Sequence, residues 1–194
     1  MGELFQQGWI KPHSNCLGKL RRVPSPNFDD RPLGMPIDTL VLHYISLPAN
    51  VMSGSCVEDF FCNRLDVGRH SDFEVLSGMR VSAHFFLRRN GALIQFVSCE
   101  QRAWHAGVSM LLGRERCNDF SIGIEIEGSS DIAFTNRQYA RLQKLTQALC
   151  ARYPLSYVVG HSDIAPDRKQ DPGPFFDWQR FLKSVDIAPL SRPF

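Results

Sequence analysis

The sequence lacks a long hydrophobic run. No stretch approaches the roughly 18 consecutive apolar residues that a membrane-spanning helix needs. Residues 1–10 also lack the basic segment followed by an apolar segment that marks a secretory signal peptide. We therefore expect no membrane association and a cytoplasmic location.

The sequence also lacks an excess of charge of either sign. Lys and Arg together number 22 against 20 Asp and Glu, so the net charge is +2. Nucleic acids and anionic membranes attract strongly basic surfaces. We expect neither as a partner.

Three common functional motifs are absent as well. The sequence has no G-x-G-x-x-G loop for phosphates and no G-x-S-x-G turn to carry a serine nucleophile. It has no C-x-x-C pair, so a structural zinc knot or a disulfide framework is not indicated. We expect reduced, partly buried thiols at all six cysteines, which are Cys16, Cys56, Cys62, Cys99, Cys117 and Cys150.

The 194 residues are 43% hydrophobic, which is enough for one well-buried core. We predict a single domain over residues 1–194 and a monomer. Pro24, Pro26 and Pro32 interrupt the N-terminal part, so within residues 1–36 we expect an irregular approach to the core, above all over residues 11–36.

Short apolar segments predict the strands. Residues 39–45 form a buried strand in which Val41, His43 and Ile45 share a face. Residues 120–127 alternate, with isoleucines on one face and small or acidic residues on the other. Asn90-Gly91 predicts a type I′ hairpin turn between strands at 83–89 and 92–97. Residues 157–159 form a further strand that delivers Gly160 and His161 at its end.

Helices are predicted between these strands. Residues 56–65 form a short helix, and residues 66–80 read as a loop. Thr135 to Gln138 is a capping-box pattern that starts a helix, with Phe134 and Tyr139 as a hydrophobic staple. A last amphipathic helix begins at Pro174 and carries Phe175, Trp178, Phe181 and Leu182. The order of elements predicts an α/β fold with a central mixed β-sheet flanked by helices.

His161 and Asp171 lie ten residues apart on either side of Lys169, and His43 ends a predicted strand. Two histidines and a carboxylate are a typical ligand set for catalytic zinc, which keeps a further position open for water. Each residue also has an ordinary interpretation, as a core histidine, a loop histidine or a turn aspartate. Asp163 and Asp167 compete with Asp171 for the carboxylate role.

Other polar residues allow two interpretations each. Glu125 and Glu127 are either surface acids or, near a metal, a general base. Lys169 is either a solvated cation or a group that stabilises an oxyanion. His84 is expected to be a buried core histidine. His105, beside Trp104 in a loop, suits contact with a substrate.

Six segments of the sequence resemble the cytoplasmic 1,6-anhydro-N-acetylmuramyl-L-alanine amidases, within the type 2 N-acetylmuramoyl-L-alanine amidase family. The resemblance covers nearly the whole chain, and its longest block is the most specific. The segments are 21–26 (RRVPSP), 43–48 (HYISLP), 80–84 (RVSAH), 102–107 (RAWHAG), 113–128 (GRERCNDFSIGIEIEG) and 160–174 (GHSDIAPDRKQDPGP). Tyr44 departs from the pattern, because some relatives have asparagine after the first ligand.

The resemblance implies the amidase fold shared with T7 lysozyme and peptidoglycan-recognition proteins. It implies that His43, His161 and Asp171 bind Zn²⁺, with Glu125 and Lys169 catalytic. The remaining matched positions, which would contact the substrate, are Arg80, Trp104 and Arg116, with His105 beside them.

The implied reaction cleaves the lactyl amide of anhydromuropeptides in the bacterial cytoplasm during cell-wall recycling, which would indirectly repress β-lactamase. Two alternatives remain: a muropeptide-binding module without activity, and an amidase that acts on intact periplasmic murein. Residues 48–80 form a long segment that we consider as a lid.

Overall fold

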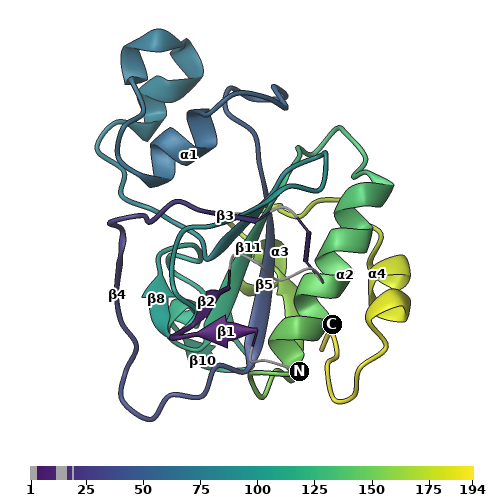
Figure 1. The fold of residues 1–194 in the computed structure, drawn as a ribbon. Coiled ribbons are helices and arrows are strands. Elements are labelled where there is room, and N and C mark those ends of the chain that lie inside the picture. Colours follow the sequence, from purple (N-terminus) through teal and green to yellow (C-terminus); the bar gives the residue numbers. More distant parts are fainter. Residues whose placement is uncertain (1–3, 12–16, 19) are drawn as a thin grey trace.

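A six-stranded mixed β-sheet forms the centre of the protein, for which the computed structural model describes residues 4–11, 17–18 and 20–194 (Figure 1). The strand order is β12-β5-β11-β6-β7-β3. The first four strands are parallel, β7 runs antiparallel to β6, and β3 is parallel to β7. The strands are β3 (Leu20–Arg22), β5 (Thr39–Ile45), β6 (Phe85–Leu87), β7 (Leu93–Gln95), β11 (Ser121–Glu127) and β12 (Tyr157–Gly160). The predicted α/β fold with a mixed sheet is confirmed.

Three two-stranded sheets lie beside the central sheet. They are β1 (Phe5–Gln6) with β2 (Trp9–Ile10), β4 (Phe28–Asp30) with β8 (Gln101–Ala103), and β9 (Met110–Leu111) with β10 (Arg114–Glu115). The prediction of an irregular segment within residues 1–36 is therefore wrong where β1 to β4 form. β3 and β4 pair with partners 71 to 75 residues away, and the prolines stand between the strands rather than within them.

The helices cover both faces of the sheet. They are α1 (Cys56–Phe61), α2 (Asn136–Cys150), α3 (His161–Ile164) and α4 (Trp178–Val185), with 3₁₀ helices η1 (Val67–Arg69), η2 (Ser71–Leu76) and η3 (Cys117–Asp119). Figure 1 shows α2 and α4 together at one side of the sheet and α1 at the other. The sheet is therefore a middle layer, buried on both faces.

Two of the three hydrophobic clusters of the described residues reflect this layering. The isoleucines of β11 pack with Leu142 and Leu145 of α2 and with Phe181 of α4. Phe60 and Phe61 of α1 pack with Phe86 and Phe96 in a second cluster. Because β11 is buried along its whole length, its polar face does not lie in bulk solvent.

The structure corrects three predicted boundaries. The helix predicted over 56–65 ends at Phe61, and the predicted loop over 66–80 contains η1 and η2. The last helix begins at Trp178 and not at Pro174. Asp177 caps it by accepting a hydrogen bond from the Arg180 backbone N–H, a local signal that the proline rule overlooked.

The hairpin between β6 and β7 forms as predicted, but its turn differs. A type I′ turn needs positive φ at both central residues, and here Gly91 has φ +82° while Asn90 does not lie in the positive region. Arg88 N–H donates to Ala92 O and Gly91 N–H to Arg88 O. The connection is thus a three-residue loop closed by a glycine, which tolerates the left-handed conformation.

The five cysteines within the described residues are all free thiols, as predicted; Cys16 lies outside the described residues, as does His13. In the described part of the chain, no helix combines the length and the apolar character that crossing a bilayer would require.

The capping box at the start of α2 is present as predicted. Thr135 Oγ1 accepts from Gln138 N–H at 3.1 Å, and Gln138 Oε1 accepts from Thr135 N–H at 2.9 Å. Thr135 Oγ1 also donates to Arg89 O at 2.8 Å, which ties the helix to the hairpin.

We expect Thr135→Ala to lower the free energy of unfolding by about 1–2 kcal/mol, because a cap and one further hydrogen bond are lost. Urea denaturation of the metal-free protein measures this change. Thr135→Ser, which keeps the hydroxyl, should retain most of the stability. An equal loss in both variants would contradict a hydrogen-bonding role.

Candidate metal centre

The centre lies at the carboxyl ends of three adjacent parallel strands. Glu125 on β11 is the register partner of His43 on β5, and Gly160 on β12 is the partner of Leu42. His161 follows directly as the first residue of α3. Parallel strands in register carry their side chains on the same face, so the sheet itself brings these groups together, as in many open α/β sheets.

Three side-chain atoms converge on one point. His43 Nδ1 lies 3.0 Å from His161 Nδ1 and 2.8 Å from Asp171 Oδ2, and His161 Nδ1 lies 3.1 Å from Asp171 Oδ2. The three residues are 1%, 3% and 8% exposed. Within the described residues they form the group of His, Cys, Asp and Glu side chains with the spacing of metal ligands.

The hydrogen bonds behind the histidines decide which nitrogens face the centre. His161 Nε2 lies 3.0 Å from Ala106 O, which can only accept, so Nε2 carries the proton and Nδ1 keeps its lone pair. For His43, the nitrogen that carries the proton is identified from a longer chain of hydrogen bonds through Ser121 and His105. Ser121 Oγ donates to Cys117 O at 2.5 Å and lies 3.3 Å from His105 Nε2.

That chain ends at His43. Since Ser121 uses its proton on the carbonyl, His105 Nε2 donates to Ser121, and His105 Nδ1 is left as an acceptor. His105 Nδ1 lies 3.0 Å from His43 Nε2, which therefore donates. Nδ1 of both metal-site histidines is left with a lone pair.

Two imidazole lone pairs and a carboxylate oxygen thus face each other, which is unfavourable without a cation between them. Four-coordinate zinc with bonds of about 2.0–2.1 Å places its ligand atoms about 3.3 Å apart. The observed separations of 2.8 to 3.1 Å are close to that value. The residues fit a divalent ion of the type that prefers nitrogen and oxygen ligands.

The surroundings of His43 and Asp171 favour the deprotonated forms of both side chains. Burial lowers the pKa of His43 to about 4, although the adjacent Asp171 carboxylate opposes the shift. Burial alone would raise the pKa of Asp171, but the adjacent His161 and His43 rings outweigh it and hold this pKa well below its usual range. Neutral imidazole and ionised carboxylate are the forms that bind metals.

The alternative carboxylates have other partners. Asp163 accepts from Gly160 N–H and pairs with Arg192 at 2.7 Å. Asp167 is exposed and lines a different cavity. Asp171 is the carboxylate that reaches the two histidines.

Glu125 and Glu127 differ sharply in their surroundings. Glu127 accepts from Arg88 at 3.1 Å and from Arg89 N–H at 2.8 Å, so it is a structural group. Glu125 is buried, and its Oε2 has no hydrogen-bond partner among the described residues. Burial and the nearby Asp171 raise the pKa of Glu125 well above its usual range, while the charge of Lys169 opposes this. Such an unpaired buried carboxyl is typical of a functional site.

A cavity of about 270 Å³ opens onto the centre. Glu125, Lys169 and Tyr44 line it together with the three convergent residues, and Phe60, Phe61, Leu76 and Met79 form an apolar wall. That wall comes from the segment 48–80, whose motion as a lid stays a prediction. The sequence patterns did not indicate these four residues, because they look like ordinary core positions.

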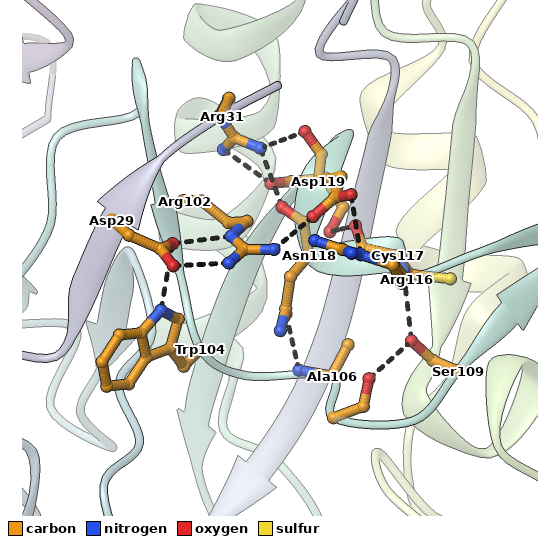
Figure 2. Close-up of polar contacts among 12 residues, drawn as sticks. Asp29, Arg31, Arg102, Trp104, Ala106, Ser109, Arg116, Cys117, Asn118 and Asp119 are labelled. Carbon is orange, nitrogen blue, oxygen red and sulfur yellow. Dashed lines mark hydrogen bonds and ion pairs between the residues drawn. The ribbon is translucent and has the colours of Figure 1, made fainter.

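The predicted substrate-contacting residues separate into two groups. Trp104 lines the cavity, and its indole Nε1 donates to Asp29 Oδ1 at 3.1 Å (Figure 2). Arg80 is exposed and lies between the lining residues Met79 and Val81. Arg116 lines a separate cavity of about 820 Å³ and pairs with Asp119 at 3.1 Å. The structure therefore does not bring Arg80 and Arg116 into the lining of the central cavity.

His105 lies deeper than its loop position predicted. It lines the cavity, but its ring nitrogens bond to His43 and Ser121. Its geometry is that of a residue that orients His43. His84 is a buried core histidine, as predicted: its Nδ1 accepts from Gly123 N–H at 3.0 Å, and its Nε2 lies 3.0 Å from Gln101 O.

Two convergent histidines, a carboxylate and a free buried glutamate in a cavity define the site of a metal-dependent hydrolase. The sequence model of the family described as N-acetylmuramoyl-L-alanine amidase matches residues 33–174. The chain belongs to this family.

Individual relatives agree. The "1,6-anhydro-N-acetylmuramyl-L-alanine amidase AmpD" of Haemophilus influenzae is 51% identical over 168 residues, covering 85% of this chain and 91% of the relative. A crystal structure of a selenomethionine AmpD derivative matches with a TM-score of 0.87 at 46% identity, covering 94% and 99% of the two chains. The amidase AmiD from E. coli, in complex with its substrate, matches with a TM-score of 0.56 at 33% identity, covering 80% and 60%. The predicted amidase fold is confirmed.

Gly123 allows the His105 ring to approach the sheet. A Cβ at this position would lie 2.4 to 2.6 Å from atoms of that ring, so Gly123→Ala must displace it. We expect the affinity of this centre for a divalent metal ion to fall by about 10- to 100-fold, as is typical when the partner of a metal-binding histidine is lost. Chelator competition measures the affinity. Gly68→Ala, whose Cβ would meet its nearest neighbour at 3.4 Å, is the control and should not change it.

His84 should make the metal-free protein sensitive to acid. Burial, and then the nearby Arg31 charge, lower its pKa to about 3, against about 6.5 in an unfolded chain. Between these two pH values the unfolded state binds more protons than the folded state. The contribution of His84 to the free energy of unfolding is therefore fully present above pH 6.5 and is lost as the pH decreases. The slope approaches about 1.4 kcal/mol per pH unit for this group.

Urea denaturation between pH 7 and pH 4.5 tests the role of His84. His84→Asn cannot titrate at this position, so the slope of the free energy of unfolding against pH should decrease by the equivalent of about one proton. Other buried histidines contribute to the slope that is left. An unchanged slope in this variant would contradict the assignment.

Proposed function

We propose that this protein is a zinc-dependent amidase that cleaves the lactyl amide between 1,6-anhydro-N-acetylmuramic acid and L-alanine. The observation that carries the proposal is the convergence of His43, His161 and Asp171 beside the unpaired Glu125 in one cavity. The names of the AmpD relatives support the bond. The AmiD complex holds anhydro-N-acetylmuramic acid-L-Ala-D-gamma-Glu-L-Lys, which supports the substrate class.

In this proposal His43 Nδ1, His161 Nδ1 and Asp171 Oδ2 hold the zinc. When bound, zinc polarises a carbonyl and lowers the pKa of water to near neutrality. His105 and Ala106 O keep the two imidazoles in the required tautomer. Asp171 reduces the net charge of the centre.

Glu125 is the proton carrier of the reaction. Its carboxylate takes a proton from the attacking water as the oxygen–carbon bond forms, and gives a proton to the alanine nitrogen as the carbon–nitrogen bond breaks. A raised pKa suits a group that must hold the proton between these steps. The products are a lactyl carboxylic acid and the free amine of the peptide.

Lys169 is the electrostatic partner of this step. Its side chain lines the same cavity, and its ammonium stabilises the negative charge that develops on the amide oxygen. The apolar wall of Phe60, Phe61 and Leu76 limits access of water and strengthens this interaction.

The cavity of about 270 Å³ accommodates the scissile amide and its neighbours rather than a whole muropeptide. Trp104 contacts the substrate in the cavity, and the sugar and peptide extend beyond it. Arg80 and Arg116, which lie outside the lining, contact these outer parts. We place the reaction in bacterial cytoplasmic recycling of cell-wall fragments.

A muropeptide-binding module without activity is the second candidate. The complete ligand set and the unpaired Glu125 favour an enzyme over this alternative. Action on intact murein is the third candidate, and incubation with sacculi and with anhydromuropeptides distinguishes it. Strong release of peptide from sacculi would contradict a recycling enzyme.

Separate substitutions test the metal site and the base. Asp171→Ala should lose both zinc and activity, because one of three ligands is removed. Glu125→Gln should keep zinc and lose activity by about 10²- to 10⁴-fold, the range for general acid–base groups. Metal analysis of the purified proteins and mass spectrometry of a reaction on anhydromuramyl tripeptide measure the two properties.

Glu100→Gln is the control for this experiment, because Glu100 lies half-exposed in an ion pair with Arg152. It should keep both zinc and activity. Near-normal turnover by Glu125→Gln would refute the assigned role of Glu125.

A further inference from the structure

Both zinc-site histidines are oriented by one dipeptide. His43 Nε2 donates to the His105 ring at 3.0 Å, and His161 Nε2 donates to Ala106 O at 3.0 Å. His43 lies on β5 and His161 begins α3, and the two are 118 residues apart in the chain. Their two acceptors are nevertheless adjacent residues, so any shift of the segment 105–106 changes both ligands at once.

One side chain accepts hydrogen bonds from both backbone N–H groups of that dipeptide. Asn118 Oδ1 accepts from His105 N–H at 3.1 Å and from Ala106 N–H at 2.8 Å. One amide oxygen with two lone pairs can satisfy both donors. The contact fixes the peptide planes on either side of the His105 Cα, which set the direction of its side chain, and it anchors the N–H side of Ala106, whose carbonyl belongs to the next peptide unit.

Asn118 lies in η3, and two arginine side chains hold this turn in place. Arg31 donates to the backbone oxygens of Asn118 and Asp119, each at 3.0 Å. Arg102 pairs with Asp119 at 2.6 Å and with Asp29. Figure 2 shows this network reaching from Asp29 through Arg102 and Asp119 to the turn that carries Asn118.

The neighbouring loop has further anchors that do not involve Asn118. Trp104 N–H donates to Ser82 Oγ at 3.1 Å, and Arg168 donates to Ala106 O at 2.9 Å and to Val108 O at 2.7 Å. Loss of Asn118 should therefore leave the loop in its place and disturb mainly the orientation of the peptides at 105 and 106.

From this geometry we propose that Asn118 is a positioning residue for the metal centre, which it controls through the backbone of His105 and Ala106. The inference rests on the proposed zinc function. Its physical content is that one hydrogen-bond acceptor holds the backbone N–H groups of both residues that supply the second interaction of the imidazole ligands. Asn118 has no contact with the ion or the substrate in this role.

The test measures zinc affinity of the full chain by competition with a chromophoric chelator. Asn118→Ala leaves two N–H groups without their acceptor, and zinc affinity should fall by about 10- to 100-fold. Asn118→Asp has the same shape and keeps an acceptor oxygen, so its affinity should stay near that of the wild type. Asn118→Ser cannot reach both N–H groups and should behave like alanine, and it carries the test if the alanine variant does not fold.

Gln138→Ala controls for a general loss of stability. Gln138 is a buried side chain that donates to Glu127 O at 2.8 Å and caps α2, away from the dipeptide. This variant should melt at a lower temperature in the metal-free form but bind zinc as the wild type does.

The outcomes separate the two proposals. If the wild-type protein binds no zinc, the proposed function fails. If the wild type binds zinc and Asn118→Ala binds it equally well, or Asn118→Asp loses affinity as Asn118→Ala does, only the role of Asn118 is overturned.

Discussion

The site depends on which ring nitrogen carries the proton in His43 and in His161. Ala106 O can only accept, and the chain from Cys117 O through Ser121 and His105 leaves a single direction for each hydrogen bond. Both Nδ1 atoms therefore face Asp171 as lone pairs. A hydrogen bond reversed at any point of that chain would place a proton where a metal ion must bind.

The fold supplies the rigidity that this arrangement needs. β12, β5 and β11 are adjacent parallel strands in register in a sheet that is buried on both faces, so His43, Glu125 and His161 start from backbone positions that cannot slide independently. A slip of one residue would turn every side chain of a strand to the opposite face. Buried polar groups are costly unless paired. Among the described residues, Glu125 Oε2 is a buried oxygen without a partner, and Glu125 lines the cavity of the candidate site.

The polar side and the apolar side of the cavity come from different parts of the fold. The polar side comes from the sheet, from the loop 104–106, which the network of Asp29, Arg102 and Asp119 secures, and from the segment that carries Lys169 and Asp171. The apolar side comes from α1, η2 and their connections. The polar groups of the candidate site therefore lie on the well-anchored side of the cavity, and its apolar wall comes from short elements.

Much of this protein follows from local patterns in its sequence. The strand over Thr39–Ile45, the capping box at Thr135 and the convergence of His43, His161 and Asp171 were all predicted, because periodicity, capping and ligand chemistry act over a few residues or through residue type. Contacts between distant segments were not. β3 and β4 form only because β7 and β8 offer edges, and the burial of His105 depends on the absence of a side chain at Gly123.

The division has a physical reason. Which residues are able to bind a metal or start a helix is a property of the side chains themselves, and the sequence by itself determined it. Which nitrogen of a histidine holds its proton, which glutamate is left unpaired and which asparagine holds the loop are decided by neighbours brought together by packing. A backbone carbonyl such as that of Ala106 leaves no trace in sequence, so only the tertiary structure decided how the ligands are oriented.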